Sequence, residues 1–293
     1  MTKKLFNFDG ENAYHNDRSY LAIDNILDKQ LIEDILSEFP NNKNDFPHKG
    51  WKGNRVSLQF GTKEFDLFIS KTRGFKKLVD YLSSEECYKF IFEHFFERAK
   101  ELGLKDRYLN QNKVLFNGFT TEFVVTTNFF KKVYIKFFYN PIYRKYNIRS
   151  YFRRFLRMYI KPTVFPLISI NCSEKGYLEP LHIDARHKML VGLIYLDDIE
   201  EGGELVLYKL KKYASLSDHK MYPEYDDVNE IARIKSSSNK LVLFMNSNNF
   251  YHGTTPFNSK RRFIYFSYAF KDEESCFETN YPVYKGDATP SEI

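Results

Sequence analysis

The stretch KLVLFMNSNNFYHGTTPFNSKRRFIYFSYAF, residues 240–270, contains three short apolar runs separated by turn-forming residues. Three similar runs precede it: FPLISINC (165–172), HKMLVGLIYL (187–196) and GELVLYKL (203–210). Runs of this length that are rich in β-branched and aromatic residues indicate strands rather than helices. We therefore predict a mainly β core with flanking helices, an α+β protein whose strands form an antiparallel sandwich or barrel of the jelly-roll class.

The region before this core has a different pattern. SYLAIDNILDKQLIEDILSEFP (19–40) predicts a short strand and then a helix that Asp24 or Asn25 could cap, and a second helix is predicted at about 83–102. We expect an N-terminal helical or mixed region at 1–164, the β core at 165–271 and a C-terminal tail at 272–293, all within one structural unit.

Composition narrows the class of protein. Aromatic residues make up 18% of the 293 residues, which excludes a disordered chain. The three cysteines, Cys87, Cys172 and Cys276, lack CxxC spacing, which argues against a disulfide framework or a zinc ribbon. The N-terminus lacks the apolar core of a secretory signal, and no stretch approaches the roughly 18 apolar residues of a spanning helix. We expect a soluble, cytoplasmic protein.

The positive charge of the chain is concentrated in one segment. The net charge is +6, yet ten lysines and arginines lie between Glu122 and Glu174 without any acidic residue, so the rest of the chain carries −4. Within this segment, residues 148–161 have the spacing of a basic aromatic helix. Such a helix could simply pack its aromatic face while its arginines are solvated. The alternatives are binding to an anionic membrane surface, an anionic substrate or nucleic acid.

The stretch LHIDARHK (181–188) contains a histidine and an aspartate two positions apart. In a strand, such residues project from the same side, so His182 and Asp184 would converge while Ile183 points the other way. The spacing therefore predicts a metal-binding pair. The alternative is that the two are unrelated polar residues in a solvated loop, which would show the same spacing.

A third ligand should come from another strand. His187 is too close to Asp184 to be more than a neighbour of the site, and His219 lies in a polar insertion. His252 follows the apolar run KLVLFM and precedes a glycine, which leaves room for a metal pocket. Two imidazoles and one carboxylate match the iron(II) sites that leave three coordination positions open, and zinc is the second candidate.

Two adjacent arginines, Arg261 and Arg262, stand at the head of the last apolar run. A buried arginine is costly unless it meets an anion, and its planar guanidinium can hold a carboxylate with two parallel hydrogen bonds. Because side chains alternate along a strand, only one of the two can point inward.

Six segments in a fixed order resemble the iron(II)- and 2-oxoglutarate-dependent oxygenases of the prolyl-4-hydroxylase-like branch. These segments are HID (182–184), YLDD (195–198), EEGGEL (200–205), KLVLFM (240–245), HGTTPF (252–257) and RRFIYFSY (261–268). The resemblance covers roughly residues 165–271, and residues 19–35 resemble the strand and helix with which such proteins often open.

This resemblance implies a double-stranded β-helix, a cupin-like core, with Fe(II) held by His182, Asp184 and His252. It also implies 2-oxoglutarate as co-substrate, with its distal carboxylate on Arg262, the arginine directly followed by the apolar strand. Tyr195 is the second expected contact to that carboxylate. Family members often place a tyrosine on the strand before the His-x-Asp pair, where this chain offers only Ser169 or Asn171.

The implied activity is hydroxylation of an unactivated C–H bond, coupled to conversion of 2-oxoglutarate and O2 into succinate and CO2, with ascorbate as a candidate reductant. Retention of Asp184 favours hydroxylation over halogenation. The substrate is open, with an anionic or carrier-linked molecule favoured; membrane contact through 149–161 is a candidate and nucleic acid is less favoured. The alternative is a non-catalytic binding module of the same fold that docks through its basic helix.

Overall fold

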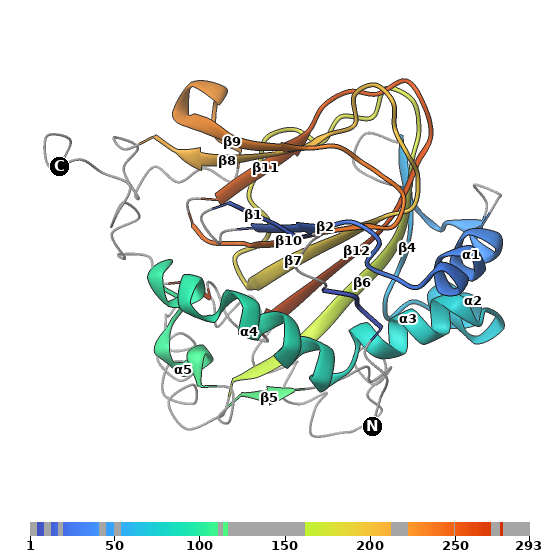
Figure 1. Ribbon diagram of the computed structural model, residues 1–293, viewed down its shortest axis with the longest axis horizontal. Coiled ribbons are helices and arrows are strands. Elements are labelled where there is room, and N and C mark those ends of the chain that lie inside the picture. The colour runs from blue at the N-terminus through green and yellow to red at the C-terminus, as the bar shows by residue number, and fades with distance from the viewer. Residues whose placement is uncertain are drawn as a thin grey trace, which may run out of the picture.

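The computed structural model (Figure 1) describes ten segments of the chain. They are residues 5–8, 13–16, 20–40, 45–49, 54–110, 114–116, 162–211, 222–248, 250–270 and 276–277. The basic helix predicted at 148–161 and most of the tail predicted at 272–293 lie outside these segments. Within them, no helix has the length and apolar character needed to cross a bilayer.

Two antiparallel sheets face each other across the core (Figure 1). In the described segments, the larger sheet has nine strands: eight in the order β1-β2-β10-β7-β12-β6-β4-β3, and β5, which lies parallel beside β6. Their bounds are β1 (Ala13–Asn16), β2 (Tyr20–Ile23), β3 (His48–Lys49), β4 (Arg55–Gln59), β5 (Leu115–Phe116), β6 (Thr163–Ser173), β7 (Lys188–Tyr195), β10 (Lys240–Met245) and β12 (Arg261–Phe270).

The smaller sheet has the order β11-β8-β9, with β8 (Leu205–Leu210), β9 (Val228–Ile234) and β11 (Phe250–Thr254). The two sheets pack as in a double-stranded β-helix, which confirms the predicted α+β class with a jelly-roll core. All six predicted apolar runs form strands. The strands that were not predicted are β9, which has only two buried residues and therefore no apolar run, and β1, β3, β4 and β5, which lie in the N-terminal region.

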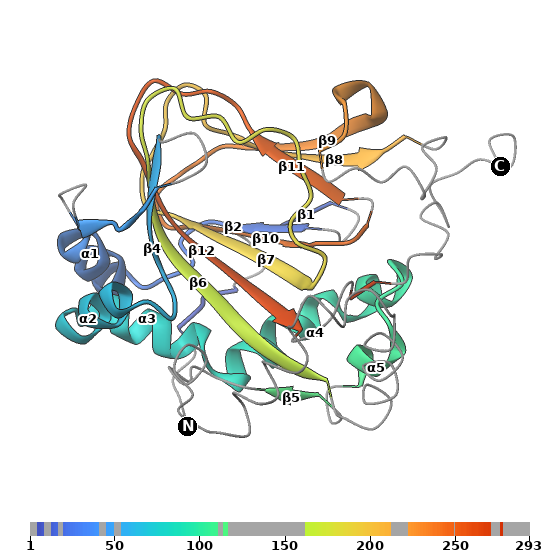
Figure 2. The ribbon, with the colours of Figure 1, turned by 180° about the vertical axis from the view of Figure 1, so that it is seen from behind.

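The helices cover the outer face of the larger sheet, as both ribbon views show (Figures 1 and 2). They are α1 (Lys29–Glu38), α2 (Lys63–Lys71), α3 (Gly74–Leu82), α4 (Glu85–Glu101) and α5 (Asp106–Leu109), and a short 3-10 turn, η6 (Tyr225–Asp227), precedes β9. Helix α4 fulfils the prediction at 83–102, with Ser84 as its cap.

The predicted cap of α1 was wrong. The carboxylate of Asp28 accepts a hydrogen bond of 2.8 Å from the backbone N–H of Leu31, so the helix begins later than Asp24 or Asn25 would allow. Asn25 has a φ of 54°, which helical geometry excludes. The apolar residues Ile26 and Leu27 are still buried, but they are buried in the turn before the helix.

The alternation of side chains along β12 separates two apolar layers. Ile264 and Phe266 belong to the layer between the larger sheet and the helices, whereas Phe263 belongs to the layer between the two sheets. The helical layer anchors the sheet from behind. As a consequence, every second side chain of the central strands faces the space between the sheets, and the candidate site lies in that space.

Candidate active site

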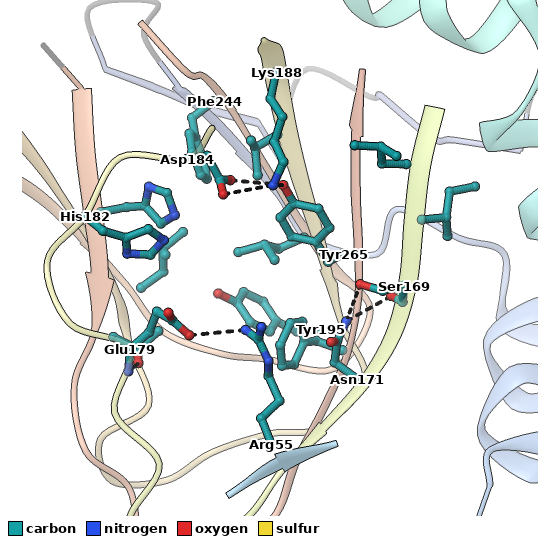
Figure 3. A pocket seen from close by; sticks show the side chains of 18 of the residues that line it. Arg55, Ser169, Asn171, Glu179, His182, Asp184, Lys188, Tyr195, Phe244 and Tyr265 are labelled. Atoms are coloured by element: carbon teal, nitrogen blue, oxygen red, sulfur yellow. Dashed lines mark hydrogen bonds and ion pairs between the residues drawn. The ribbon is translucent and has the colours of Figure 1, made fainter. Parts of the chain in front are cut away.

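A cavity of about 430 Å³ opens between the two sheets (Figure 3). Its walls come from β4, β6, β7, β11, β12 and the segment before β7. Five of the six predicted site residues line it, namely Asn171, His182, Asp184, Tyr195 and His252. Arg262 does not, and its neighbour Arg261 does.

His182 and His252 come from segments far apart in the chain and meet across an isolated antiparallel bridge. Each backbone N–H donates to the other residue's carbonyl oxygen at 2.9 Å, and the ring centroids lie 4.2 Å apart. A Cβ on Gly253 would stand 3.2 Å from the carbonyl oxygen of Glu179, tighter than most side chains accept. The glycine after His252 thus allows the two segments to approach each other.

The imidazole of His182 is oriented by a backbone contact. Its Nδ1 lies 2.8 Å from the carbonyl oxygen of Pro180, so Nδ1 donates a hydrogen there and Nε2 is the ring nitrogen left for a ligand. Burial, reinforced by the nearby His182, lowers the pKa of His252 to about 3, which keeps it neutral. Its buried Nδ1 has no hydrogen-bond partner among the described residues.

Asp184 lies at the same end of the cavity and is bonded to two side chains that the sequence analysis did not select (Figure 3). Lys188 Nζ donates to its Oδ1 at 2.9 Å, and the hydroxyl of Tyr265 donates to its Oδ2 at 3.0 Å. Burial alone would raise the pKa of Asp184, but the ammonium of Lys188 and the two histidines hold it well below its usual range. The carboxylate is therefore ionised.

Among the described residues, no three His, Cys, Asp or Glu side chains are arranged so that all of them reach one metal position. The two imidazoles lie next to each other, whereas the carboxylate of Asp184 is bonded to Lys188 and Tyr265. The donor chemistry fits a divalent metal nonetheless, because the imidazole of His252 is neutral, the carboxylate is ionised, and the buried Nδ1 of His252 lacks a partner among the described residues.

The predicted inward direction of Arg262 was wrong. Its guanidinium binds the carboxylate of Asp197, with Nη2 at 2.6 Å and Nε at 3.0 Å from Oδ1. Arg261 enters the cavity instead, in the same row of β12 as Phe263 and Tyr265. Neighbouring side chains of a strand point to opposite faces, so the direction of one arginine fixes that of the other.

Arg261 is 2% exposed and is surrounded by aromatic rings. Its guanidinium carbon lies 4.9, 5.2 and 5.9 Å from the ring centroids of Phe257, Phe263 and Tyr195, and Nη1 donates to the carbonyl oxygen of Gly203 at 2.7 Å. Within the described segments no carboxylate lies within ion-pair distance of it, and its Nε has no partner. A buried cation with free donors is a site for an anion that enters the cavity.

Tyr195 and Asn171 differ in how far they are free to bind a ligand. The buried hydroxyl of Tyr195 has no partner among the described residues, and burial raises its pKa to about 12, so it is a proton donor. The amide Nδ2 of Asn171 is already bonded to the backbone oxygen and the hydroxyl of Ser169, at 3.0 and 2.9 Å. Tyr195 therefore offers an available donor beside Arg261, and Asn171 does not.

The cavity wall also contains a cluster that was not predicted. Arg55 on β4 forms an ion pair of 3.2 Å with Glu179, and its guanidinium donates to the hydroxyl of Tyr177 at 3.1 Å (Figure 3). Residues 40–165 carry no motif that could be assigned from the sequence. By contrast, the row Arg261, Phe263, Tyr265 follows from alternation and could have pointed to Tyr265.

Comparison with known proteins finds a family model that matches the β core. Residues 168–270 match the family model described as the 2OG-Fe(II) oxygenase superfamily. No curated protein matches the chain significantly.

Three solved structures that are similar to the chain are distant from it in sequence. A prolyl 4-hydroxylase from Phytophthora capsici has 12% identity and a TM-score of 0.47, over 88% of this chain and 61% of that one. A Trichoplax adhaerens prolyl hydroxylase, in complex with a hypoxia-inducible-factor peptide, has 14% identity and a TM-score of 0.46, over 88% and 86%. A Pseudomonas putida prolyl-4-hydroxylase has 10% identity and a TM-score of 0.45, over 86% and 92%. This chain thus spans less than two thirds of the Phytophthora structure.

Proposed function

We propose, from the premise that residues 168–270 form a domain of the 2OG-Fe(II) oxygenase superfamily, that this protein is an Fe(II)- and 2-oxoglutarate-dependent dioxygenase. It would hydroxylate an unactivated C–H bond of a substrate that is not yet identified. The observation that carries the proposal is the combination within one cavity of two imidazoles, an ionised carboxylate and a buried arginine that has no carboxylate partner among the described residues.

His182, Asp184 and His252 would hold the iron. When bound, Fe(II) supplies the activation of O2 that couples decarboxylation of 2-oxoglutarate to hydroxylation of the substrate. The protein's part is orientation: the carbonyl oxygen of Pro180 fixes the ring of His182, and the backbone bridge between the histidines fixes their spacing. Oriented ligands of this kind raise both the affinity and the selectivity of a metal site.

Arg261, rather than Arg262, would bind the distal carboxylate of 2-oxoglutarate. Its Nε has no hydrogen-bond partner among the described residues, and the hydroxyl of Tyr195 is a further donor that lines the same cavity. The aromatic rings around the guanidinium exclude water, which strengthens an ion pair made there. The role predicted for Asn171 is not supported, because its amide is engaged by Ser169.

The substrate stays a prediction of chemical class only. Arg55, Tyr177 and Glu179 form a polar wall of the cavity, and Arg55 and Glu179 are both partly exposed there. This wall accords with a polar or anionic substrate. The predicted contacts of residues 149–161 with a membrane, and the predicted cytoplasmic location, also stay predictions.

The test is an anaerobic titration of the purified protein with Fe(II) and 2-oxoglutarate. Chelation of Fe(II) by the keto acid gives a weak charge-transfer band in the visible region, and we expect this band in the wild type and its loss in Asp184→Ala. Asp197→Ala is the matched control, because Asp197 pairs with Arg262 outside the cavity. Absence of the band in the wild type would contradict the proposal.

One observation favours the alternative of a non-catalytic binding module, namely that the carboxylate of Asp184 is bonded to Lys188 and Tyr265 in the structure. That alternative predicts no succinate formation by the wild type in the presence of Fe(II), 2-oxoglutarate and O2. It also predicts binding to vesicles of anionic lipid, and the substitutions Arg153→Glu and Arg157→Glu would abolish that binding.

A further inference from the structure

A β-bulge in β7 aims Lys188 into the cavity. Val191, Leu193 and Tyr195 line the cavity at alternate positions, and continuing this alternation would place Met189 inside and turn Lys188 away. In the observed register, however, Tyr268 pairs with Leu190 and the next residue of β12 pairs with Lys188. The extra residue reverses the alternation, and such bulges are typical of strands that redirect a side chain near a functional site.

Inside the cavity, the ammonium of Lys188 joins Asp184 and Tyr265 in a closed ring of hydrogen bonds. Lys188 Nζ donates to Asp184 Oδ1 at 2.9 Å and to the hydroxyl oxygen of Tyr265 at 2.7 Å. That hydroxyl in turn donates to Asp184 Oδ2 at 3.0 Å. The two donors therefore lie side by side across the open side of the carboxylate, and each occupies one of its oxygens.

This ring limits how the carboxylate can bind a metal. Each carboxylate oxygen has two lone pairs, so one lone pair on each remains after the hydrogen bonds to Lys188 and Tyr265. Chelation through both oxygens would use the lone pairs on the side that the two donors occupy. Binding through one oxygen, by contrast, leaves the ring intact.

We propose that Lys188 and Tyr265 are positioning residues that restrict the carboxylate of Asp184 to binding the iron through one oxygen. This inference rests on the proposed function. A carboxylate bound through one oxygen, together with two imidazoles, leaves three positions of an octahedral iron for the keto acid and O2. A chelating carboxylate would take one of these positions and compete with the co-substrate.

The contacts of Lys188 and Asp184 differ from those of an ordinary surface ion pair. Lys188 and Asp184 are only 18% and 14% exposed as side chains, and the tyrosine that completes the ring lies in the same inward row as Arg261. Lys240 and Asp24 form a comparable pair elsewhere, at 3.2 Å with side-chain exposures of 13% and 31%, outside the cavity. Lys240→Met therefore removes a similar pair without touching the site.

The experiment compares Lys188→Met, Lys188→Arg and Lys240→Met with the wild type, each loaded anaerobically with Fe(II). We expect Lys188→Met to weaken 2-oxoglutarate binding by about tenfold or more, the size typical of lost contacts to a metal ligand, and to shift the charge-transfer band. Lys188→Arg should restore most of the affinity, and Lys240→Met should leave both the affinity and the band unchanged. Cobalt(II) absorption spectra of the same proteins report the coordination change independently of turnover.

Tyr265→Phe keeps the ring and removes one donor, so it tests the same inference if Lys188→Met does not fold. We expect it to shift the band in the same direction and to weaken binding by a few-fold. Unchanged affinity, band and cobalt spectrum in a folded variant would overturn the inference while leaving the proposed function intact. Absence of the band from the wild type would instead overturn both.

Discussion

The two adjacent arginines of β12 lie on opposite faces of the strand and have different partners. On the outer face, Arg262 holds the carboxylate of Asp197 through Nε and Nη2, and both side chains are partly exposed. On the inner face, Arg261 is buried, and its guanidinium donates to the carbonyl oxygen of Gly203. Among the described residues, the arginine on one face is therefore neutralised by a carboxylate, and the arginine on the other face has no carboxylate partner.

The difference teaches how to recognise a binding residue. A buried guanidinium without a carboxylate is costly for the folded state, so it is maintained only where an anion from outside the chain can complete it. An arginine with an internal carboxylate needs no such ligand. This contrast is the reason for proposing Arg261 as the co-substrate contact, whereas Arg262 forms an internal ion pair.

The largest expected effect is that of Arg261→Met on co-substrate binding. Removing the cation from a buried charge pair typically weakens binding by about a hundredfold, so the Kd of the Fe(II)-loaded protein for 2-oxoglutarate should rise by that order. The melting temperature of the metal-free protein should stay the same or rise, because an unpaired buried charge is removed. A Kd within about twofold of the wild type would sink the assignment of Arg261.

A smaller effect is expected from Gly202→Ala, which disturbs the support of Arg261. Gly202 has a φ of 71°, and a Cβ there would overlap the carbonyl oxygen of Pro256. We expect a loss of about 2–3 kcal/mol in the free energy of unfolding, measured with denaturant. Co-substrate affinity should fall as well, because the adjacent Gly203 supplies the carbonyl oxygen that binds Arg261.

Gly176→Ala separates the two causes of that loss. Gly176 also has a positive φ, 78°, but a Cβ there would meet nothing within 4 Å. It should lose only about 1 kcal/mol from backbone strain and leave 2-oxoglutarate binding unchanged. Equal losses in both variants would show that the contact with Pro256 contributes nothing.

The smallest effect is expected from Arg262→Met. The ion pair that it removes is partly exposed, and Asp197 keeps its hydrogen bond of 2.7 Å from the backbone N–H of residue 262. We expect a loss of about 1 kcal/mol in the free energy of unfolding and a Kd for 2-oxoglutarate equal to that of the wild type. If Arg262→Met weakened co-substrate binding more than Arg261→Met, the two roles would be reversed.

Much of the β core was predictable because strand formation follows a local pattern. The apolar runs at 165–172, 187–196 and 240–245 appear as β6, β7 and β10. His182 and Asp184 both line the cavity, although they lie in the segment before β7 and not within a named strand. Their metal-binding role and that of His252 stay predictions. β9 was not predicted because only two of its residues are buried, so it carries no apolar run.

The local sequence pattern did not predict the direction of a side chain where that direction depends on a neighbouring strand. Alternation showed that only one of Arg261 and Arg262 faces inward, but it could not say which, because nothing within the strand marks its inner face. The inward direction of Lys188 was not predicted for a related reason, because the bulge that turns it inward exists only in the pairing of β7 with β12.

The sequence by itself determined the strands, the kinds of residues able to hold a metal and an anion, and the family that this combination resembles. These depend on residue type and on spacing over a few positions. Only the tertiary structure decided that Arg261 faces the cavity, that Lys188 and Tyr265 bind Asp184, and that Arg55 forms part of the wall. The physical reason is that the direction of a side chain in a sheet is set by register and packing with other strands, which residues close in sequence do not encode.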